Sequence, residues 1–118
     1  MNINAILNEA PAKISRYTEQ EINEYKKMIG FHEFYKRERA RKYLEAKVKE
    51  DITIKDLEYR LDCDPDLMKI KDDEQLAEIA YRGFRRKKEY ARDMLQIAFE
   101  TGWNKRVEMR SLNDTVKM

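Results

Sequence analysis

The segment from Asp64 to Met109 constrains the fold more than any other part of the chain. It opens with Asp64-Pro65-Asp66, a signal for a helix start, because Asp is a good N-cap residue and Pro is tolerated at the first helical position. No other proline follows in the segment, and its only glycines are Gly83 and Gly102. We therefore predict one long helix over about 65–110.

Two earlier signals mark further helix starts. Thr18-Glu19-Gln20-Glu21 has the spacing of a capping box and predicts a helix from 19 to about 50. Thr53-Ile54-Lys55-Asp56 predicts a short connecting helix over 54–61. Before them, residues 1–17 are expected to form an N-terminal helical arm that is interrupted or restarted at Pro11. Gly30 leaves open whether the first long helix ends there.

The predicted fold is all-α: a single domain over 1–118 built as a long antiparallel helical hairpin, with coiled-coil pairing of 19–50 and 65–110. Charged residues make up 41% of the 118 residues, and there are only three glycines and two prolines, which suits long amphipathic helices. Residues 111–118 are expected to be a flexible tail. Two helices alone bury only one stripe each, so we predict a homo-oligomer or an obligate partner.

The faces of both long helices follow from their angular spacing. At about 100° per residue, one side of the last helix gathers apolar residues, which are Leu76, Ile79, Ala80, Gly83, Tyr90, Ala91, Met94, Ile97 and Ala98. The matching stripe of the first helix is Tyr25, Met28, Ile29, His32, Tyr35, Tyr43 and Ala46. Pairing residue 50 with residue 66 places the acidic stretch 72–78 opposite 36–42, and the basic stretch 82–92 opposite Glu24 and Glu33.

A basic block in the last helix is the main functional candidate. Its cations are Arg82, Arg85, Arg86, Lys88 and Arg92, and aromatic residues at helical spacing accompany them, namely Tyr81, Phe99 and Trp103. Aromatic rings can stack on unpaired bases while cations pair with phosphates, so the block predicts a surface for single- or double-stranded nucleic acid. The competing interpretation is a second packing face with solvated arginines.

No pattern in the chain indicates an enzyme, a cofactor or a metal site. The segment 62–66 resembles the start of a calcium loop, but Leu67 stands where that loop needs Gly and Asp73 where it needs Glu. His32 is the only histidine and lies on the apolar stripe. The second basic stretch, 36–42, has charges on most sides of its helix, which is typical of a salt-bridged surface.

The chain also carries signals about its compartment. Its one cysteine, Cys63, excludes an internal disulfide. There is no basic leader followed by an apolar core, and no stretch approaches the roughly 20 apolar residues of a membrane span. We expect a cytoplasmic protein that does not enter a membrane.

The stretch Ala40-Arg41-Lys42-Tyr43-Leu44-Glu45-Ala46-Lys47, followed by an acidic turn and an arginine-rich helix, resembles a group of small helical proteins from tailed phages and prophages. The resemblance covers about residues 36–110. It implies a non-enzymatic accessory role in DNA recombination or replication, in the cytoplasm of a host cell, through binding nucleic acid or a protein bound to it. The alternative is a protein-binding adaptor or inhibitor, for example of a host defence enzyme, that acts through a helix face.

Overall fold

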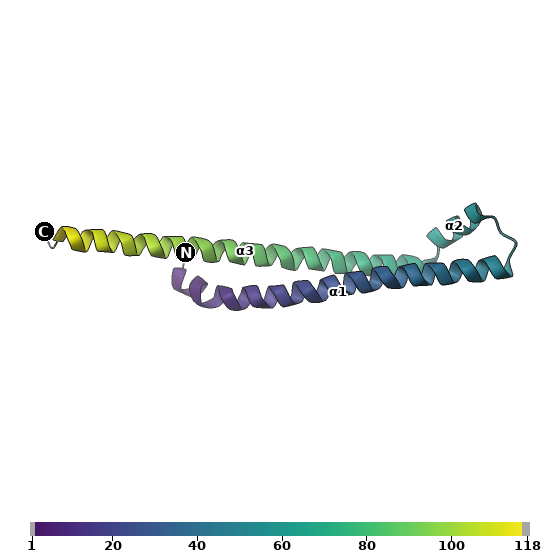
Figure 1. Ribbon diagram of the computed structural model, residues 1–118, viewed down its shortest axis with the longest axis horizontal. Helices are drawn as coiled ribbons and strands as arrows, with labels where there is room; N and C mark the ends of the chain where they lie inside the picture. Colours follow the sequence, from purple (N-terminus) through teal and green to yellow (C-terminus); the bar gives the residue numbers. More distant parts are fainter. Residues whose placement is uncertain (1, 117–118) are drawn as a thin grey trace. The chain divides into compact units, whose positions relative to one another are not determined.

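The chain folds into three helices. A computed structural model describes the backbone of residues 2–116 and the side chains of residues 2–110. The helices are α1 (Ile3–Lys49), α2 (Ile54–Asp62) and α3 (Pro65–Val116), and the described residues contain no strand (Figure 1). The all-α prediction and the short connecting helix are confirmed. α3 continues past the predicted end near 110, and the last two residues of the expected tail at 111–118 lie outside the described residues.

α1 is one continuous helix, so the N-terminal helical arm expected over 1–17 is helical from Ile3 and continues into the first long helix without an interruption. Its first turn is capped by Asn2, whose side-chain oxygen accepts from the backbone amide of Ala5 at 3.1 Å. Thr18 is not a cap. Its hydroxyl donates to the carbonyl of Ile14 at 2.8 Å, a bond that a threonine makes inside a helix. The capping-box pattern was therefore a chance match within a helical stretch.

The two suspected helix breakers of α1 do not end it. Pro11 lies within the helix at an exposed position. Gly30 is also exposed, and a methyl group added there would meet nothing within 4 Å. Both residues face solvent, so the backbone group that proline leaves unpaired can be hydrated rather than buried. The helix therefore passes through both positions.

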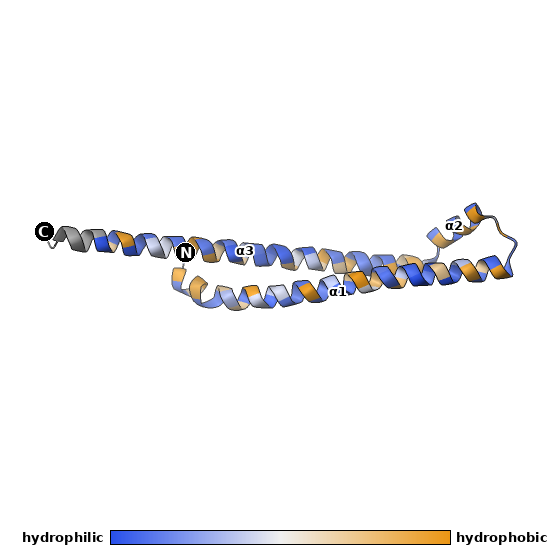
Figure 2. Cartoon of the chain, in the orientation of Figure 1, coloured by the Kyte–Doolittle hydropathy of each residue, from blue (hydrophilic) through white to orange (hydrophobic). Residues whose placement is uncertain are grey.

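Buried and half-buried residues recur along both long helices at alternating spacings of three and four, which is the heptad pattern of a coiled coil. On α1 these seam residues are Ile3, Leu7, Ala10, Ile14, Tyr17, Glu21, Glu24, Met28, Phe31, Tyr35, Glu38 and Lys42. On α3 they are Leu67, Ile70, Glu74, Ala77, Tyr81, Phe84, Lys88, Ala91, Leu95, Ala98 and Gly102. Figure 2 shows hydrophobic residues recurring between hydrophilic ones along both helices.

The predicted apolar face of the last helix is only partly right. Ala91 and Ala98 are buried in the seam, whereas Ile79 and Tyr90 are 68% and 67% exposed. Leu76 and Ile97 are exposed as well. Much of the predicted face is displaced from the seam by one residue, since the exposed Leu76 and Ile97 directly precede the buried Ala77 and Ala98.

The chain divides into two units. Residues 21–82 form what we call the central unit, and residues 1–20 and 83–118 form the terminal unit. Each unit pairs a segment of α1 with a segment of α3.

The pairing in the central unit is antiparallel. The ring centroids of Tyr25 and Tyr81 lie 5.4 Å apart, and Nδ1 of His32 lies 3.0 Å from a carboxylate oxygen of Glu74. Further along, Nζ of Lys42 lies 2.8 Å from Asp64. The residue numbers of the partners on α3 therefore decrease as the residue numbers on α1 increase.

The predicted register of the hairpin was about ten residues out, because Lys42 faces Asp64 rather than the stretch 72–78. The last turns of α1 pack on α2 instead of α3. Tyr43 and Ala46 contact a core of buried leucines formed by Leu57, Leu61 and Leu67. Glu24 and Glu33, expected to face the basic block, pair within α1 with Lys27 and Lys36 at 3.1 and 3.9 Å.

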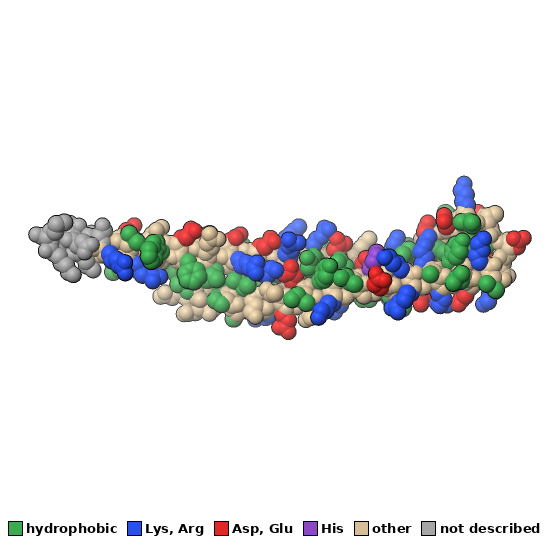
Figure 3. Space-filling view, in the orientation of Figure 1, with side chains coloured by type: hydrophobic (Ala, Val, Ile, Leu, Met, Phe, Trp, Pro, Cys, Tyr) green, Lys and Arg blue, Asp and Glu red, His purple; other side chains and the backbone are tan. Residues whose placement is uncertain are grey.

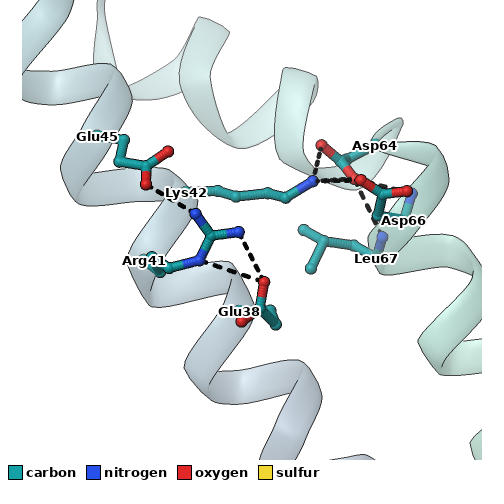
Figure 4. A network of polar contacts seen from close by, with 7 residues as sticks. All are labelled: Glu38, Arg41, Lys42, Glu45, Asp64, Asp66 and Leu67. Carbon is teal, nitrogen blue, oxygen red and sulfur yellow. Dashed lines mark hydrogen bonds and ion pairs between the residues drawn. The ribbon is translucent and has the colours of Figure 1, made fainter.

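The start of α3 is held by a polar network at the end of the central unit (Figure 4). Asp64 caps the helix by accepting from the amides of Asp66 and Leu67 at 3.0 and 3.1 Å. Lys42 donates to both oxygens of Asp64 at 2.8 Å and to Asp66 at 3.1 Å. The bond from Lys42, with that from the Leu67 amide, lowers the pKa of Asp64 below its usual value. The bond to Asp64 raises the pKa of Lys42 in turn.

Further ion pairs lie at the same end of the central unit. Arg39 pairs with Asp62 at 2.9 Å, and Arg60 with Glu50 at 2.6 Å. Arg41 bridges two acids of its own helix, Glu38 at 2.8 Å and Glu45 at 2.7 Å. The carboxylates of 62–66 therefore act as helix caps and ion-pair partners, and the salt-bridged surface predicted for 36–42 is confirmed.

The terminal unit has a seam of small and large residues. Nζ of Lys87 lies 6.0 Å from the ring centroid of Tyr17, and Leu7 lines a hollow together with Gly102. With the seam spacing, these contacts place Leu7 opposite Ala98 and Ile14 opposite Ala91. Large side chains thus meet alanines across the seam, and the unit has no cluster of leucines like that of the central unit among its described residues.

Candidate nucleic-acid interface

A continuous exposed stripe runs along α3 in the terminal unit. Eight exposed residues follow one another at spacings of three and four, so they share one side of the helix. These residues, which we call the basic–aromatic stripe, are Arg85, Glu89, Arg92, Gln96, Phe99, Trp103, Arg106 and Arg110. The stripe contains four arginines and a single acidic residue. It unites four of the candidates from the sequence: Arg85, Arg92, Phe99 and Trp103.

Two arginines of the stripe were missed by the sequence reasoning. Arg106 and Arg110 continue the same spacing beyond Trp103. They were overlooked because attention stayed on the dense block at 81–92, although extension of the three-and-four spacing would have found them.

The stripe's arginines are engaged to different degrees. Arg85 lies 3.4 Å from Glu89, and Nε of Arg106 donates to the carbonyl of Gly102 at 3.4 Å. Arg92 is exposed, and no described carboxylate forms an ion pair with it. An exposed pair such as Arg85–Glu89 is weak, so it can open for an anionic ligand at little cost.

The two aromatic residues of the stripe are open to solvent. Phe99 is 56% exposed and Trp103 is 58% exposed. They are one helical turn apart and line a shallow hollow of about 470 Å³ together with Arg106. Within the single chain neither ring is packed against another helix, since more than half of each side chain is exposed.

The other predicted site residues lie elsewhere. Tyr81 and Lys88 are half-buried seam residues, and the ring of Tyr81 packs at a tilt against that of Tyr25. Arg86 is exposed on a different side of α3 from the stripe. Arg82 belongs to the central unit, where it pairs with Glu78 at 2.7 Å. The structure thus divides the predicted block into a stripe, two seam residues and two separate arginines.

The edge of α1 that borders the stripe carries no charge. Asn4 and Arg106 line the same hollow, so the side of α1 that carries Asn4 borders the stripe. At the same helical positions further along lie Asn8, Pro11 and Ser15, all exposed. Within the described side chains, α1 therefore offers no carboxylate to neutralise the stripe from this side.

Charge is also divided unequally between the two units. The terminal unit has eleven Lys and Arg residues against seven Asp and Glu, a net charge of +4. The central unit has fourteen against sixteen, a net charge of −2. The overall charge of +2 conceals this difference, which concentrates positive potential where the stripe lies. In Figure 3, Lys and Arg side chains lie between hydrophobic ones on the visible face.

Comparisons with protein-family models, with characterised proteins and with solved structures gave no match. Within the described residues, no three His, Cys, Asp or Glu side chains are grouped to hold a metal ion. None of the described helices is both long and apolar enough to cross a membrane.

Proposed function

We propose that the protein binds single-stranded nucleic acid through the basic–aromatic stripe of α3. The observation that carries the proposal is the stripe itself, in which four exposed arginines and two exposed rings share one side of a helix. A straight helix holds these groups at fixed intervals, and arginines seven residues apart are separated by about 10 Å along the axis.

Each part of the stripe has a distinct role in this proposal. Arg85, Arg92, Arg106 and Arg110 pair with phosphates, each releasing counterions from the strand. Phe99 and Trp103 stack on unpaired bases, which favours a single strand because bases in a duplex are not open to rings on a helix surface. Neither contact reads base edges, so we expect little sequence preference.

The charge part of the proposal is tested by titrating the full chain with labelled single-stranded and duplex oligonucleotides at several salt concentrations. Four phosphate contacts predict a slope of about −3 in a plot of log affinity against log salt for a single strand. Arg92→Glu with Arg106→Glu should abolish binding at moderate salt. Lys47→Glu with Lys55→Glu is the matched control, because it changes the net charge equally at exposed positions of the central unit.

The stacking part is tested through Trp103, the only tryptophan of the chain. A stacked base should quench its fluorescence, and the quenching should saturate with the binding isotherm. Phe99→Ala is expected to weaken affinity by about 1–3 kcal/mol, the range for one stacked base. Tyr59→Ala, which removes a ring 73% exposed on α2, is the control and should have no effect. Absence of binding at low salt would overturn the proposal.

The setting we propose is a non-enzymatic accessory protein of phage-type DNA recombination or replication. It rests on the sequence resemblance over about 36–110 together with the stripe. If no nucleic acid binds, the adaptor or inhibitor function becomes the leading alternative, since exposed apolar residues of α3 offer a surface for another helix.

A further inference from the structure

A second stripe of the terminal unit, made of exposed and half-buried residues, lies across the seam from the basic–aromatic stripe. It comprises Gly83, Lys87, Tyr90, Met94 and Ile97, again at alternating spacings of three and four, and we call it the apolar stripe. Tyr90 is 67% exposed and Ile97 is 44% exposed. Because this spacing repeats the heptad pattern of the seam, the shape it fits is another helix.

A groove runs beside the apolar stripe within the terminal unit. It has a volume of about 320 Å³ and is lined by Ile6, Lys13 and Tyr17 of α1 and by Lys87, Tyr90 and Met94 of α3. Most of the residues that line it are apolar, and its charged lining residues are two lysines and Glu9. A helix that covers the stripe would have side chains at the right spacing to enter this groove.

We propose that the occupant is a second copy of this chain, packed antiparallel through α3. A two-fold axis between residues 88 and 89 brings Lys87 over Tyr90 of the second copy, and Gly83 against Met94 of the second copy. Both contacts occur twice by symmetry. The first repeats an arrangement already present in the terminal unit, where Lys87 lies 6.0 Å from the centroid of Tyr17.

The sizes of the paired residues support this register. Gly83 has open space around it, since a methyl group added there meets nothing within 4 Å. The long side chain of Met94 in the second copy fills that space. The seam of the terminal unit follows the same rule, with Leu7 opposite Ala98 and Ile14 opposite Ala91.

The flanking charges select the antiparallel orientation. Arg86 and Asp93 are exposed beside the apolar stripe, on the same side of it. In the antiparallel register each Arg86 lies across from Asp93 of the other copy. A parallel pairing in register would instead set Arg86 against Arg86 and Lys87 against Lys87, and like charges at such positions oppose association.

The first test measures the mass of the full chain by sedimentation over low to high micromolar concentrations. We expect a shift from 14.3 kDa toward twice that mass, and a return to monomer for Tyr90→Glu. Tyr59→Glu places the same charge at an exposed ring of α2 and should leave the dimer intact. Circular dichroism confirms that each variant keeps its helices. A monomer at all concentrations, or a Tyr90→Glu variant that still dimerises, would overturn the proposal.

The second test identifies the orientation through disulfides. In a Cys63→Ser background, one chain carries Gly83→Cys and another carries Met94→Cys. Gly83 tolerates the substitution in the single chain because its surroundings are open. The mixture should cross-link several-fold faster than either chain alone, since the two sites face each other only between antiparallel copies. Cross-linking of the Gly83→Cys chain alone at the same rate as the mixture would contradict the proposal.

The third test reverses the flanking charges. Arg86→Asp alone sets two acids against each other and should weaken dimerisation. Arg86→Asp combined with Asp93→Arg restores the pairing and should recover most of the loss. Recovery by the double variant supports the antiparallel register, and an additive loss in the double variant would refute it.

Discussion

The two units of the chain are built from the same two long helices but differ in what stabilises them. The central unit has a cluster of buried leucines and a dense network of ion pairs around the start of α3. The terminal unit has an alanine-rich seam and an excess of positive charge, whereas exposed aromatic and apolar residues occur in both units. The comparison separates the cluster of buried leucines, which lies in the central unit, from the basic–aromatic stripe and the apolar stripe, for which we propose partners and which lie in the terminal unit.

The largest expected difference concerns the leucine cluster. Leu57 is fully buried, so Leu57→Ala should lower the free energy of unfolding by about 2–5 kcal/mol through lost burial and a cavity. Urea unfolding followed by circular dichroism measures this effect. Leu44→Ala is the matched control, because Leu44 is 63% exposed and its truncation should change stability by less than about 0.5 kcal/mol. Equal effects of the two variants would contradict a central unit held by its leucines.

The second prediction concerns the polar network and its dependence on pH. Because the folded pKa of Asp64 lies below its unfolded value of about 3.9, the carboxylate stabilises the fold fully above that pH. Its contribution is lost as the pH falls through the folded pKa. We therefore expect the free energy of unfolding to decrease below about pH 4.

Asp64→Asn isolates this contribution, since asparagine still caps a helix but does not titrate. Its unfolding free energy should vary less with acid pH than that of the native chain. Asp51→Asn, at an exposed position outside the network, should leave the native pH profile unchanged. If the Asp64→Asn and native profiles were parallel throughout the acid range, the Lys42–Asp64 pair would not be the source of the effect.

Several features of the fold were predictable from the sequence for identifiable reasons. The scarcity of glycine and proline predicted the all-α class. The caps at Thr53 and Asp64 predicted α2 and the start of α3, because both caps act through local hydrogen bonds. The wrongly predicted helix start at Thr18 also has a local cause. A threonine hydroxyl can cap a helix, but it can equally well donate to a backbone carbonyl inside one, as Thr18 does. Local patterns therefore predicted the helices well and the helix boundaries less reliably.

The register and the stripes were harder to predict because they depend on tertiary packing. The ten-residue error arose because the end of α1 packs on α2, which no local pattern reveals. The candidate site residues fall on different sides of α3 for a related reason. Tyr81 and Lys88 belong to a seam that is displaced by one residue from much of the predicted apolar face, so the stripe ending at Arg110 emerged only once burial was known.

The smallest expected effect compares one glycine of each unit. Gly30 in the central unit and Gly83 in the terminal unit are both helical, and a methyl group at either meets nothing within 4 Å in the single chain. Alanine should stabilise a helix interior by about 0.5–1 kcal/mol relative to glycine, so both substitutions should raise the free energy of unfolding in dilute protein. At concentrations where the chain dimerises, Gly30→Ala should keep its gain, whereas Gly83→Ala should lose some of it by crowding Met94 of the second copy. Urea unfolding at low and high protein concentration measures both. An equal gain for the two variants at every concentration would show that Gly83 meets no partner, and that the apolar stripe of the terminal unit is as open in solution as Gly30.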